Sequence, residues 1–298
     1  MGIAGRTLLV ALALLVGAWV SGRIERRLTR GEPGPARQPG ASVVHLGRRD
    51  RWLYPAGPAV ALAAVLLGAV VIPFGPALVG ENLQIGVFYF IVVIDFAVLG
   101  IALSGWGANT AHAVEACYRA VAQLVAYVVP LGMAVVGAIM MAKSLSTTRI
   151  VEAQQEVWFI VLQPLGFALY LVTGLMQCYR APFLEPFADS VEGGVLGVSN
   201  GPEAVLWRLA LSGLLLLVAA MGAVLFLGGW SGPWLPPPLW MALKTLGLMI
   251  MMLAGGRMVR PLSVARMLGL SWKVLIPLGL ANVLLVGGLI LLKIGPAG

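Results

Sequence analysis

Residues 205–228 read VLWRLALSGLLLLVAAMGAVLFLG and contain a single charged residue, Arg208. A helix needs about 20 predominantly apolar residues to cross the hydrocarbon core of a membrane, which is roughly 30 Å thick. Lipid offers no partners to backbone N–H and C=O groups, and a helix satisfies these groups internally. This stretch therefore predicts a membrane-spanning helix.

Apolar runs of similar length recur along the whole chain. Hydrophobic residues make up 60% of the 298 positions and charged residues only 11%, whereas soluble domains carry roughly 25% charged residues. The short alternating segments typical of a membrane β-barrel are absent. The sequence thus predicts an all-α polytopic membrane protein, a single integral membrane domain over residues 1–298 with about eight transmembrane helices. We place these spans near residues 6–22, 55–78, 84–104, 118–142, 157–178, 205–228, 235–255 and 272–293.

Lysine and arginine gather in one set of loops. The loops that join spans one and two, three and four, five and six, and seven and eight hold 15 of the 20 basic residues. Basic loops favour the cytoplasmic side. We therefore expect large cytoplasmic loops at about 23–54 and 179–204, with both termini on the outer (periplasmic) side of a bacterial inner membrane. The net charge of +8 is explained by this topology, so no nucleic-acid partner is predicted.

Ionisable residues inside apolar spans are costly and are candidates for function. Asp95 lies in the middle of the third predicted span, where a proton relay and a structural hydrogen bond are both open. Lys244 in the seventh span is close enough to the helix end to reach water. The sequence has no phosphate-binding loop, dinucleotide fingerprint or metal-ligand spacing, so we expect no cofactor bound by this chain, no metal site and no catalytic residue of its own.

Several short motifs go beyond a generic membrane protein. In order and spacing they resemble the membrane-anchor subunit of respiratory complex I, the NADH dehydrogenase subunit 1 family, which includes homologous subunits of energy-converting hydrogenases. The motifs are Glu25-Arg26-Arg27 with a Gly/Pro-rich loop at 30–37, Gly105-Trp106-Gly107-Ala108-Asn109 with 118–127, Arg180-Ala181-Pro182-Phe183, Leu225-Phe226-Leu227-Gly228-Gly229-Trp230, and Arg257 to Pro261 with 270–278.

This resemblance implies a subunit of a proton-translocating NADH:quinone oxidoreductase of the respiratory chain. The family's subunit forms part of the quinone chamber and links the redox arm to the proton-pumping arm. Quinone is then the substrate, and iron–sulfur clusters and flavin belong to partners, which are peripheral quinone-site and iron–sulfur subunits, antiporter-like membrane subunits and the lipid bilayer. The implied residues of the quinone chamber and coupling loops are Glu25, Arg26, Arg37, Arg180, Pro182, Phe183, Glu185, Asp189 and Glu192.

The chain departs from the family in its acidic residues. In the loop after Phe183 only Asp189 keeps the family register, and Glu185 and Glu192 are displaced by one position. The family's glutamate after Tyr127 is replaced by Val128. We therefore treat a scaffold role as favoured over a standard proton path. Hypothetical members of an altered proton path are Asp95, Glu115 and Glu203.

Two other functions stay open. The homologous membrane subunit of an energy-converting (group 4) hydrogenase or ferredoxin-linked complex has the same helices, and its nickel–iron site would lie on a partner. A stand-alone secondary transporter is the third possibility. Such transporters are commonly built from two structural repeats, and we find no internal repeat in this sequence.

Overall fold

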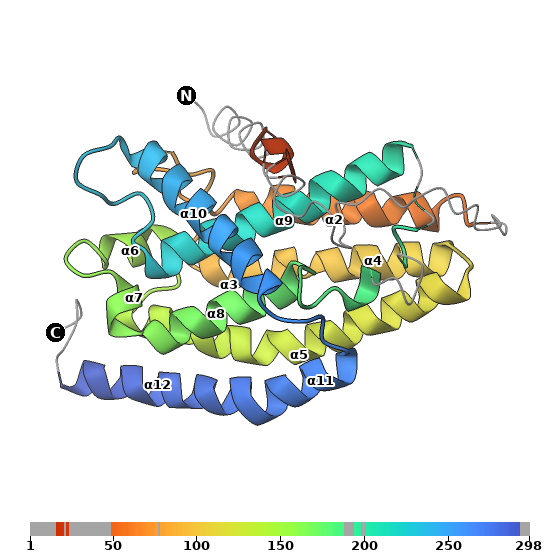
Figure 1. Cartoon of the computed structure of the whole chain (residues 1–298). Coiled ribbons are helices and arrows are strands. Elements are labelled where there is room, and N and C mark those ends of the chain that lie inside the picture. Colours follow the sequence, from red (N-terminus) through yellow and green to blue (C-terminus); the bar gives the residue numbers. More distant parts are fainter. Residues whose placement is uncertain are drawn as a thin grey trace.

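The computed structural model of the chain describes residues 16–20, 22–23, 49–76, 78–187, 194–197, 199 and 201–292, and the regular structure in these ranges is helical (Figure 1). Its elements are α2 (Leu53–Ala69), α3 (Gly86–Ile94), α4 (Phe96–Gly107), α5 (Ala111–Ala142), α6 (Thr147–Glu152), α7 (Phe159–Leu162), α8 (Pro164–Gln177), the 3-10 turn η1 (Glu185–Phe187), α9 (Pro202–Phe226), α10 (Pro237–Arg257), α11 (Val264–Leu270), the π-helical turn η3 (Ser271–Leu275) and α12 (Ile276–Leu291).

Seven of the eight predicted spans coincide with apolar helices. Within the described residues, five helical stretches are long and apolar enough to cross a membrane: Gly86–Gly107, Ala111–Ala142, Pro202–Phe226, Pro237–Arg257 and Val264–Leu291. Two shorter apolar helices, α2 and α8, occupy the second and fifth predicted spans. The prediction of an all-α polytopic membrane protein is therefore confirmed. The first predicted span lies largely outside the described residues, although residues 16–20 are helical.

Several helices differ in detail from the predicted spans. The third span is interrupted by a turn at Asp95, which separates α3 from α4. The fourth begins earlier than predicted because Thr110 caps it, with Thr110 Oγ1 accepting a hydrogen bond from the Ala113 N–H at 3.3 Å. The fifth is broken at Gln163, between α7 and α8. The hydropathy pattern predicts where a span lies, but caps and turns decide its ends.

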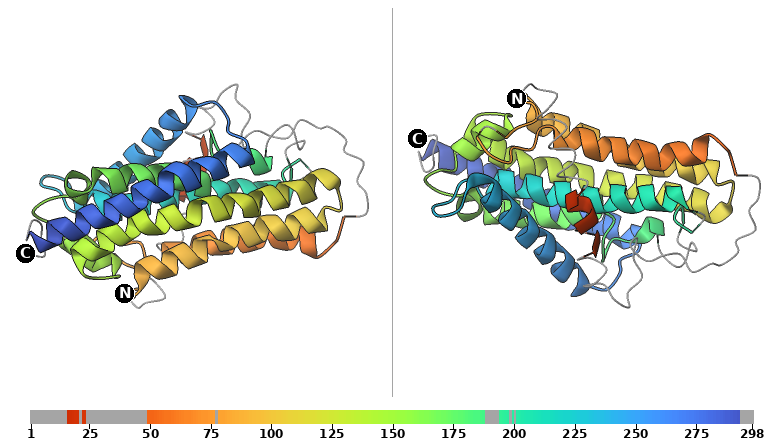
Figure 2. Two further views of the ribbon diagram at one scale, coloured as in Figure 1. Left: turned by 90° about the horizontal axis from the view of Figure 1, so that it is seen from below. Right: turned by 90° about the horizontal axis from the view of Figure 1, so that it is seen from above.

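Helix α9 forms the centre of the bundle. Of its most apolar window, 94% is buried within the protein, compared with 22% for the stretch Val264–Leu291. In Figures 1 and 2, α9 lies in the upper layer beside α2 and α10 and above α8, and α12 lies on the opposite side of the bundle. The same hydrophobicity that predicts a span therefore serves two purposes: α9 uses it for the core, and α12 uses it for the outer surface.

Helices α2 and α4 pack closely because glycines remove side chains from their contact. A Cβ atom added to Gly57 would lie 2.9 Å from Ser104 Cβ, and one added to Gly100 would lie 3.1 Å from Ala61 Cβ. Small residues let helix backbones approach in membrane proteins, where van der Waals packing contributes much of the association. Ser104 also donates a hydrogen bond from its hydroxyl to the Tyr54 carbonyl at 2.8 Å.

The start of α2 is tied to the end of α4 by Asp50. Its carboxylate accepts hydrogen bonds from the backbone N–H groups of Trp52 at 2.8 Å and Leu53 at 2.9 Å. Its own N–H donates to the Gly107 carbonyl at 2.7 Å. The two hydrogen bonds from Leu53 and Trp52 favour the charged carboxylate and hold the pKa of Asp50 below its usual value.

At the opposite end of the bundle, Gln154 and Lys244 join separate elements. Gln154 Nε2 donates to the carbonyls of Ile150 and Val224, and its Oε1 accepts from the N–H groups of Phe159 and Gly228. Lys244 was predicted to reach water near its helix end. It does reach that end, but it is only 8% exposed, and its ammonium donates to two carbonyls, those of Leu227 at 2.6 Å and Ser231 at 2.7 Å.

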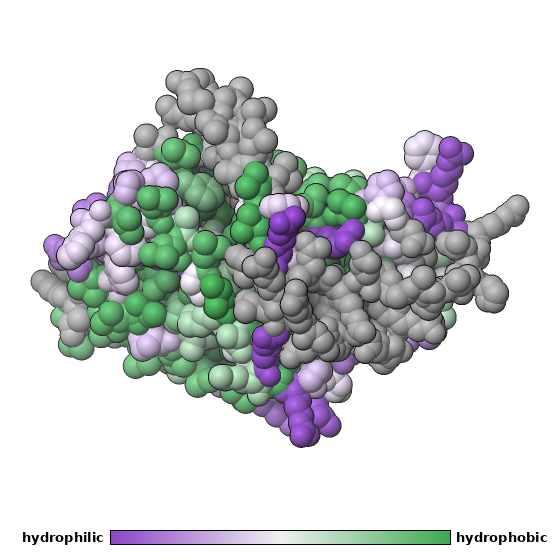
Figure 3. All heavy atoms as spheres, turned by 45° about the horizontal axis from the view of Figure 1, so that its top comes forward, coloured by the Kyte–Doolittle hydropathy of each residue, from purple (hydrophilic) through white to green (hydrophobic). Residues whose placement is uncertain are grey.

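The surface of the bundle is largely apolar, as a lipid-facing protein requires. Figure 3 shows hydrophobic residues over much of one face, with most of the strongly hydrophilic ones toward its right-hand half. Large apolar side chains are exposed on α12, among them Leu284 at 76% and Leu291 at 86%. In water such surfaces would favour aggregation, so they fit contact with lipid or with another membrane subunit.

Candidate functional site

The motifs singled out in the sequence meet around the middle of α5. Gln123, which is fully buried, donates from Nε2 to the carbonyl of Met176 in α8 at 2.6 Å and to that of Phe183 at 3.1 Å. Three residues further along α5, the Ala126 carbonyl accepts a hydrogen bond from the Ser271 hydroxyl. Segments from two distant motifs are thereby fixed to α5, which itself carries a third.

The segment after α8 turns sharply and is held at both ends. Tyr179 has a φ of +52°, and the N–H of Arg180 donates to the Leu175 carbonyl at 3.2 Å, which is the pattern of a helix C-terminus closed by a left-handed residue. Beyond the turn, the Pro182 carbonyl accepts from the Leu262 N–H at 2.9 Å. The Arg180-Ala181-Pro182-Phe183 motif therefore contacts the loop that carries Arg257 and Arg260.

The side chain of Arg180 lies in the interior of the bundle. It is 3% exposed, and its Nη2 donates to the Leu211 carbonyl of α9 at 3.2 Å. A buried guanidinium requires hydrogen-bond partners, because an unpaired charge in an apolar interior costs several kcal/mol, in the range of roughly 3–5 kcal/mol. Arg180 thus links the segment after α8 to the central helix, next to Ser212.

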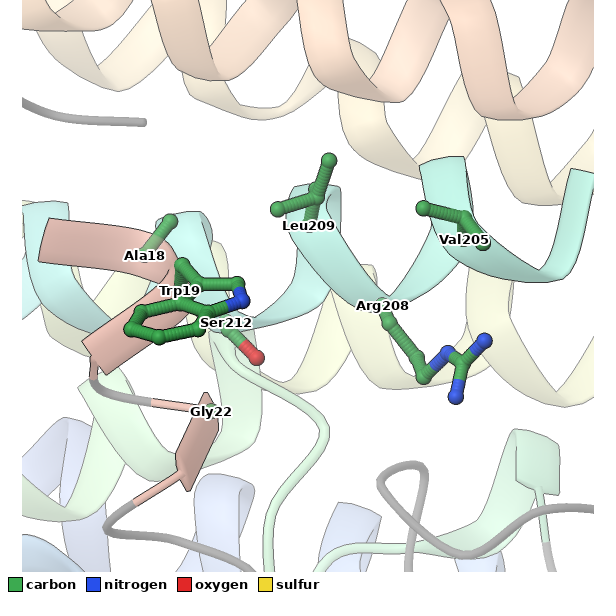
Figure 4. Close-up of a pocket in the computed structure, with 7 residues that line it drawn as sticks. All are labelled: Ala18, Trp19, Gly22, Val205, Arg208, Leu209 and Ser212. Carbon is green, nitrogen blue, oxygen red and sulfur yellow. The ribbon is translucent and has the colours of Figure 1, made fainter. Parts of the chain in front are cut away.

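A cavity of about 210 Å³ lies between α9 and the described residues at 18, 19 and 22 (Figure 4). The N-terminal segment contributes Trp19, which is stacked by Arg23 with the guanidinium carbon 3.9 Å from the ring centre. Helix α9 contributes two polar side chains, those of Arg208 and Ser212. The residues that line the cavity are Ala18, Trp19, Gly22, Val205, Arg208, Leu209 and Ser212. The walls combine apolar side chains with a basic and a hydroxyl group in similar measure, which suits an amphipathic ligand.

Two acidic residues of the predicted site share one arginine. Arg119 of α5 contacts Glu185 at 2.8 Å and Glu115, one turn earlier on its own helix, at 2.6 Å. The Glu185 side chain is 16% exposed and that of Glu115 53%. The structure therefore brings together a residue predicted for the coupling loops and one predicted for the proton path, which the sequence had placed in separate groups.

The third ion pair joins the segment before α2 to the start of α9. Both nitrogens of the Arg49 guanidinium fork contact the two carboxylate oxygens of Glu203, each at 2.8 Å. Arg49 also lies over the Tyr54 ring, with its central carbon 4.8 Å from the ring centre. Bidentate pairs of this kind are stronger than single contacts and fix the relative orientation of the groups.

Asp95 lies at the junction of α3 and α4 in a polar cluster of its own. Its Oδ1 accepts hydrogen bonds from the Tyr127 hydroxyl at 2.9 Å and from Gln177 Nε2 at 3.0 Å. Tyr127 is fully buried and Gln177 is 3% exposed. The structural hydrogen bonds considered for Asp95 are thus present, and they connect the α3–α4 junction with α5 and α8. The same bonds hold a titratable group in the interior.

The remaining predicted site residues cannot be placed. Glu25, Arg26, Arg37, Asp189 and Glu192 lie outside the described residues. In the described part of the chain, no group of three or more His, Cys, Asp and Glu side chains could hold a metal ion.

Sequence reasoning missed several residues of these clusters. Arg208 and Trp19 line the cavity, Gln123 and Gln177 hold the interior contacts, and Arg49 pairs with Glu203. The signal that could have found Gln123 and Gln177 is a polar amide inside an apolar span. The partner of Glu203 had no such signal, because Arg49 and Glu203 are 154 positions apart.

The fold and the site together define a polytopic helical membrane subunit with a cavity beside its central helix and a polar loop cluster at one end. The sequence profile described as NADH dehydrogenase matches residues 41–287. The chain belongs to this family.

Curated relatives and a solved structure agree with this assignment. The NADH-quinone oxidoreductase H 1 subunit of Rhodopseudomonas palustris (strain BisB5) is 39% identical over 240 residues, which cover 80% of this chain and 75% of the relative. The NADH-quinone oxidoreductase H 2 subunit of Syntrophobacter fumaroxidans is 34% identical over 97% of this chain and 96% of its own length. A chain of the membrane-bound sulfane sulfur reductase, an archaeal respiratory membrane complex, shares the fold with a TM-score of 0.81 at 20% identity, over 96% of this chain and 100% of its own.

Proposed function

We propose that this chain is the membrane subunit of an NADH:quinone oxidoreductase in a bacterial inner membrane. It would form part of the quinone chamber and link a peripheral redox arm to a proton-pumping membrane arm. The family match over residues 41–287 and the relatives named as NADH-quinone oxidoreductase subunits support this function. Quinone is then the substrate, and the redox centres belong to partner subunits.

The observation that carries the proposal is the cavity between α9 and the described residues at 18, 19 and 22. A quinone has a long apolar tail and a polar head, so it needs an apolar passage with a few polar groups at the inner end. The cavity has apolar side chains in its walls together with the polar groups of Arg208 and Ser212. We infer that quinone enters the chamber along this face of α9.

Proton transfer is a second part of the proposal. A proton path needs titratable groups in a low-dielectric interior, and a buried carboxylate can take up and release a proton there. Asp95 offers such a group, and it is hydrogen-bonded to Tyr127. The residue after Tyr127 is Val128, which replaces the family's glutamate. We propose that Asp95 carries part of the proton traffic, while Glu115, Glu185 and Glu203 orient the loops through their arginine partners.

A hydrogenase-type or other ferredoxin-linked complex is the alternative. The fold shared with a subunit of the sulfane sulfur reductase shows that this helical scaffold also occurs in respiratory complexes of another kind. Affinity purification through this chain, followed by mass spectrometry, separates the two functions. Flavin-binding and peripheral quinone-site subunits support the first, and a nickel–iron subunit supports the second.

The quinone cavity can be tested by filling it. In Ser212→Phe a phenyl ring replaces the hydroxymethyl group at the cavity wall, so we expect the KM for quinone to rise about tenfold, which corresponds to about 1.4 kcal/mol. Electron transfer from NADH to a water-soluble acceptor should stay unchanged, because that reaction does not use the membrane subunit. Steady-state kinetics of the reconstituted complex measure both.

The matched control is Leu284→Phe, which adds a similar ring on the exposed face of α12. Its KM for quinone should equal that of the unmodified complex. If Ser212→Phe and Leu284→Phe gave the same KM in a complex of normal composition, quinone would not pass this cavity.

A further inference from the structure

Two buried amide side chains face the same point on α5. A Cβ atom added to Gly137 would overlap Gln163 Oε1 and would lie 2.8 Å from Asn282 Nδ2. Gln163 is 2% exposed and stands at the break between α7 and α8, and Asn282 of α12 is 1% exposed. Two polar side chains, one from the break between α7 and α8 and one from α12, therefore lie against the same glycine of α5.

These amides lack hydrogen-bond partners among the described residues. Gln163 Oε1, Gln163 Nε2 and Asn282 Nδ2 are all buried without one. The oxygen and nitrogen of an amide side chain can be assigned in either order. Both atoms of Gln163 lack a partner, so the reverse assignment leaves the same two atoms unpaired. Each unpaired buried polar group costs about 1–3 kcal/mol. One molecule that both donates and accepts hydrogen bonds would satisfy all three atoms.

The backbone around the amides adds to the polarity of this space. Helix α8 begins with Pro164, directly after Gln163, and the first N–H groups of a helix have no partner within it. In this first turn, a Cβ atom added to Gly166 would lie 2.9 Å from Asn282 Nδ2 and 3.0 Å from its Oδ1. Glycine at 137 and 166 thus makes space for the two amide groups, because a Cβ atom at either position would collide with them.

We propose that Gln163, Asn282, Gly137 and Gly166 form an internal water site that joins α5, α8 and α12. Water is small and both donates and accepts, and buried water typically makes about three hydrogen bonds to groups that otherwise lack partners. Asn282 Nδ2 and Gln163 Nε2 donate to the water, and the water donates to Gln163 Oε1. Helix α12, which has few buried residues, is anchored to the bundle by this contact.

The water site is separate from the Asp95 cluster and from the quinone cavity. Gly137 follows Tyr127 by ten positions on α5, which corresponds to about 15 Å along a helix. It lies toward the end of the bundle where α5 ends and α7 begins (Figure 1). The proposal stands whichever electron donor and acceptor the complex uses.

Two methionines can report on this water by radiolytic footprinting. X-ray pulses generate hydroxyl radicals from water, and a radical formed at a bound water oxidises the side chains next to it, with methionine among the susceptible residues. A Cβ atom on Gly279 would lie 2.7 Å from Met133 Sδ, and one on Gly287 would lie 3.8 Å from Met140 Cε. Both methionines therefore lie between α5 and α12, one turn to either side of the amides.

In the intact complex in lipid nanodiscs, we expect Met133 and Met140 to be oxidised several times faster than Met251, which is exposed on α10. The double variant Gln163→Leu with Asn282→Leu should lower both rates to that of Met251. Thr173→Val is the matched control, because the Thr173 hydroxyl bonds only to carbonyls of its own helix, Leu169 and Tyr170, and its loss should leave both rates unchanged.

Equal oxidation of Met133 and Met140 in the double variant and the unmodified complex would overturn the proposal. Should the double variant not assemble, a density map of the unmodified complex decides. A water peak about 3 Å from both amides supports the site. Gln163 and Asn282 bonded directly to each other, with no water between them, would exclude it.

Discussion

Asp95 has an observed structural role and a proposed role in proton transfer, which the sequence could not separate. Its hydrogen bonds to Tyr127 and Gln177 connect three helical segments, and its carboxyl group is titratable. Both properties depend on the same carboxyl group, so removing the side chain would lose the fold contact and the proposed proton carrier together. A substitution that keeps the acceptor oxygen is needed to distinguish them.

Asp95→Asn keeps an oxygen for Tyr127 and Gln177 but cannot exchange a proton. We expect quinone reduction close to that of the unmodified complex and fewer protons translocated per electron, measured with a pH-sensitive dye in membrane vesicles. Asp95→Glu should restore part of the translocation. Unchanged translocation in Asp95→Asn would remove Asp95 from the proton path and leave its structural role.

Gln154 is the clearest structural residue among the buried amides, since both ends of its side chain are paired. Gln154→Leu leaves two N–H groups and two carbonyls without this partner, and we expect a loss of about 1–3 kcal/mol in stability. Thermal unfolding of the purified complex measures it. Gln155→Leu is the control, because Gln155 is exposed; equal unfolding temperatures for the two variants would contradict the role of Gln154.

At the scale of the helices, close contact in this protein depends on glycine where two backbones cross. The contact of α2 with α4 is the main example, with Gly57 and Gly100 facing each other's helices. The caps at Thr110 and Asp50 then decide where α5 and α2 begin. The hydropathy pattern locates each helix, but these single residues decide its length and its neighbour.

Gly100→Val should push α2 away from α4. The added side chain meets the Ala61 Cβ at 3.1 Å and the Gly57 carbonyl at 2.5 Å, and overpacking of this kind typically costs about 1–3 kcal/mol. We expect a lower yield of assembled complex and a lower unfolding temperature. Gly132→Val on α5 is the matched control for Gly100→Val, because no atom lies within 4 Å of a Cβ at Gly132. If both variants behaved alike, the contact of α2 with α4 would not limit stability.

For the whole molecule, the Arg49–Glu203 pair links segments that begin two different spans. Exchanging the charges tests whether Glu203 serves the fold or the proton path. Glu203→Arg alone should reduce assembly, because it places two cations together, and the double variant Arg49→Glu with Glu203→Arg should recover it. Blue native electrophoresis measures assembly, and vesicle assays measure proton translocation.

Two results of the exchange are informative. Recovery of both assembly and translocation would assign Glu203 to the fold. Recovery of assembly without translocation would assign its carboxylate to the proton path. If assembly stayed low in the double variant, the ion pair would not be what orients these segments.

The sequence by itself determined the class of fold, the positions of the spans and the family. These follow from properties that add up along the chain, since apolar length decides whether a helix can cross a membrane and motif order can be compared position by position. The sequence also identified Asp95 as a candidate, because a charge inside an apolar span is costly, whereas Arg180 and Glu203 were candidates through the resemblance to the family.

Only the tertiary structure decided which groups meet. It paired Arg49 with Glu203 and Arg119 with Glu185, placed Arg180 against α9, and brought Gln163 and Asn282 to one point. The turn at Asp95, the break at Gln163 and the glycine contacts set how each helix is rotated and how close it lies to its neighbours. Those are relations between residues far apart in sequence, and they depend on packing in three dimensions.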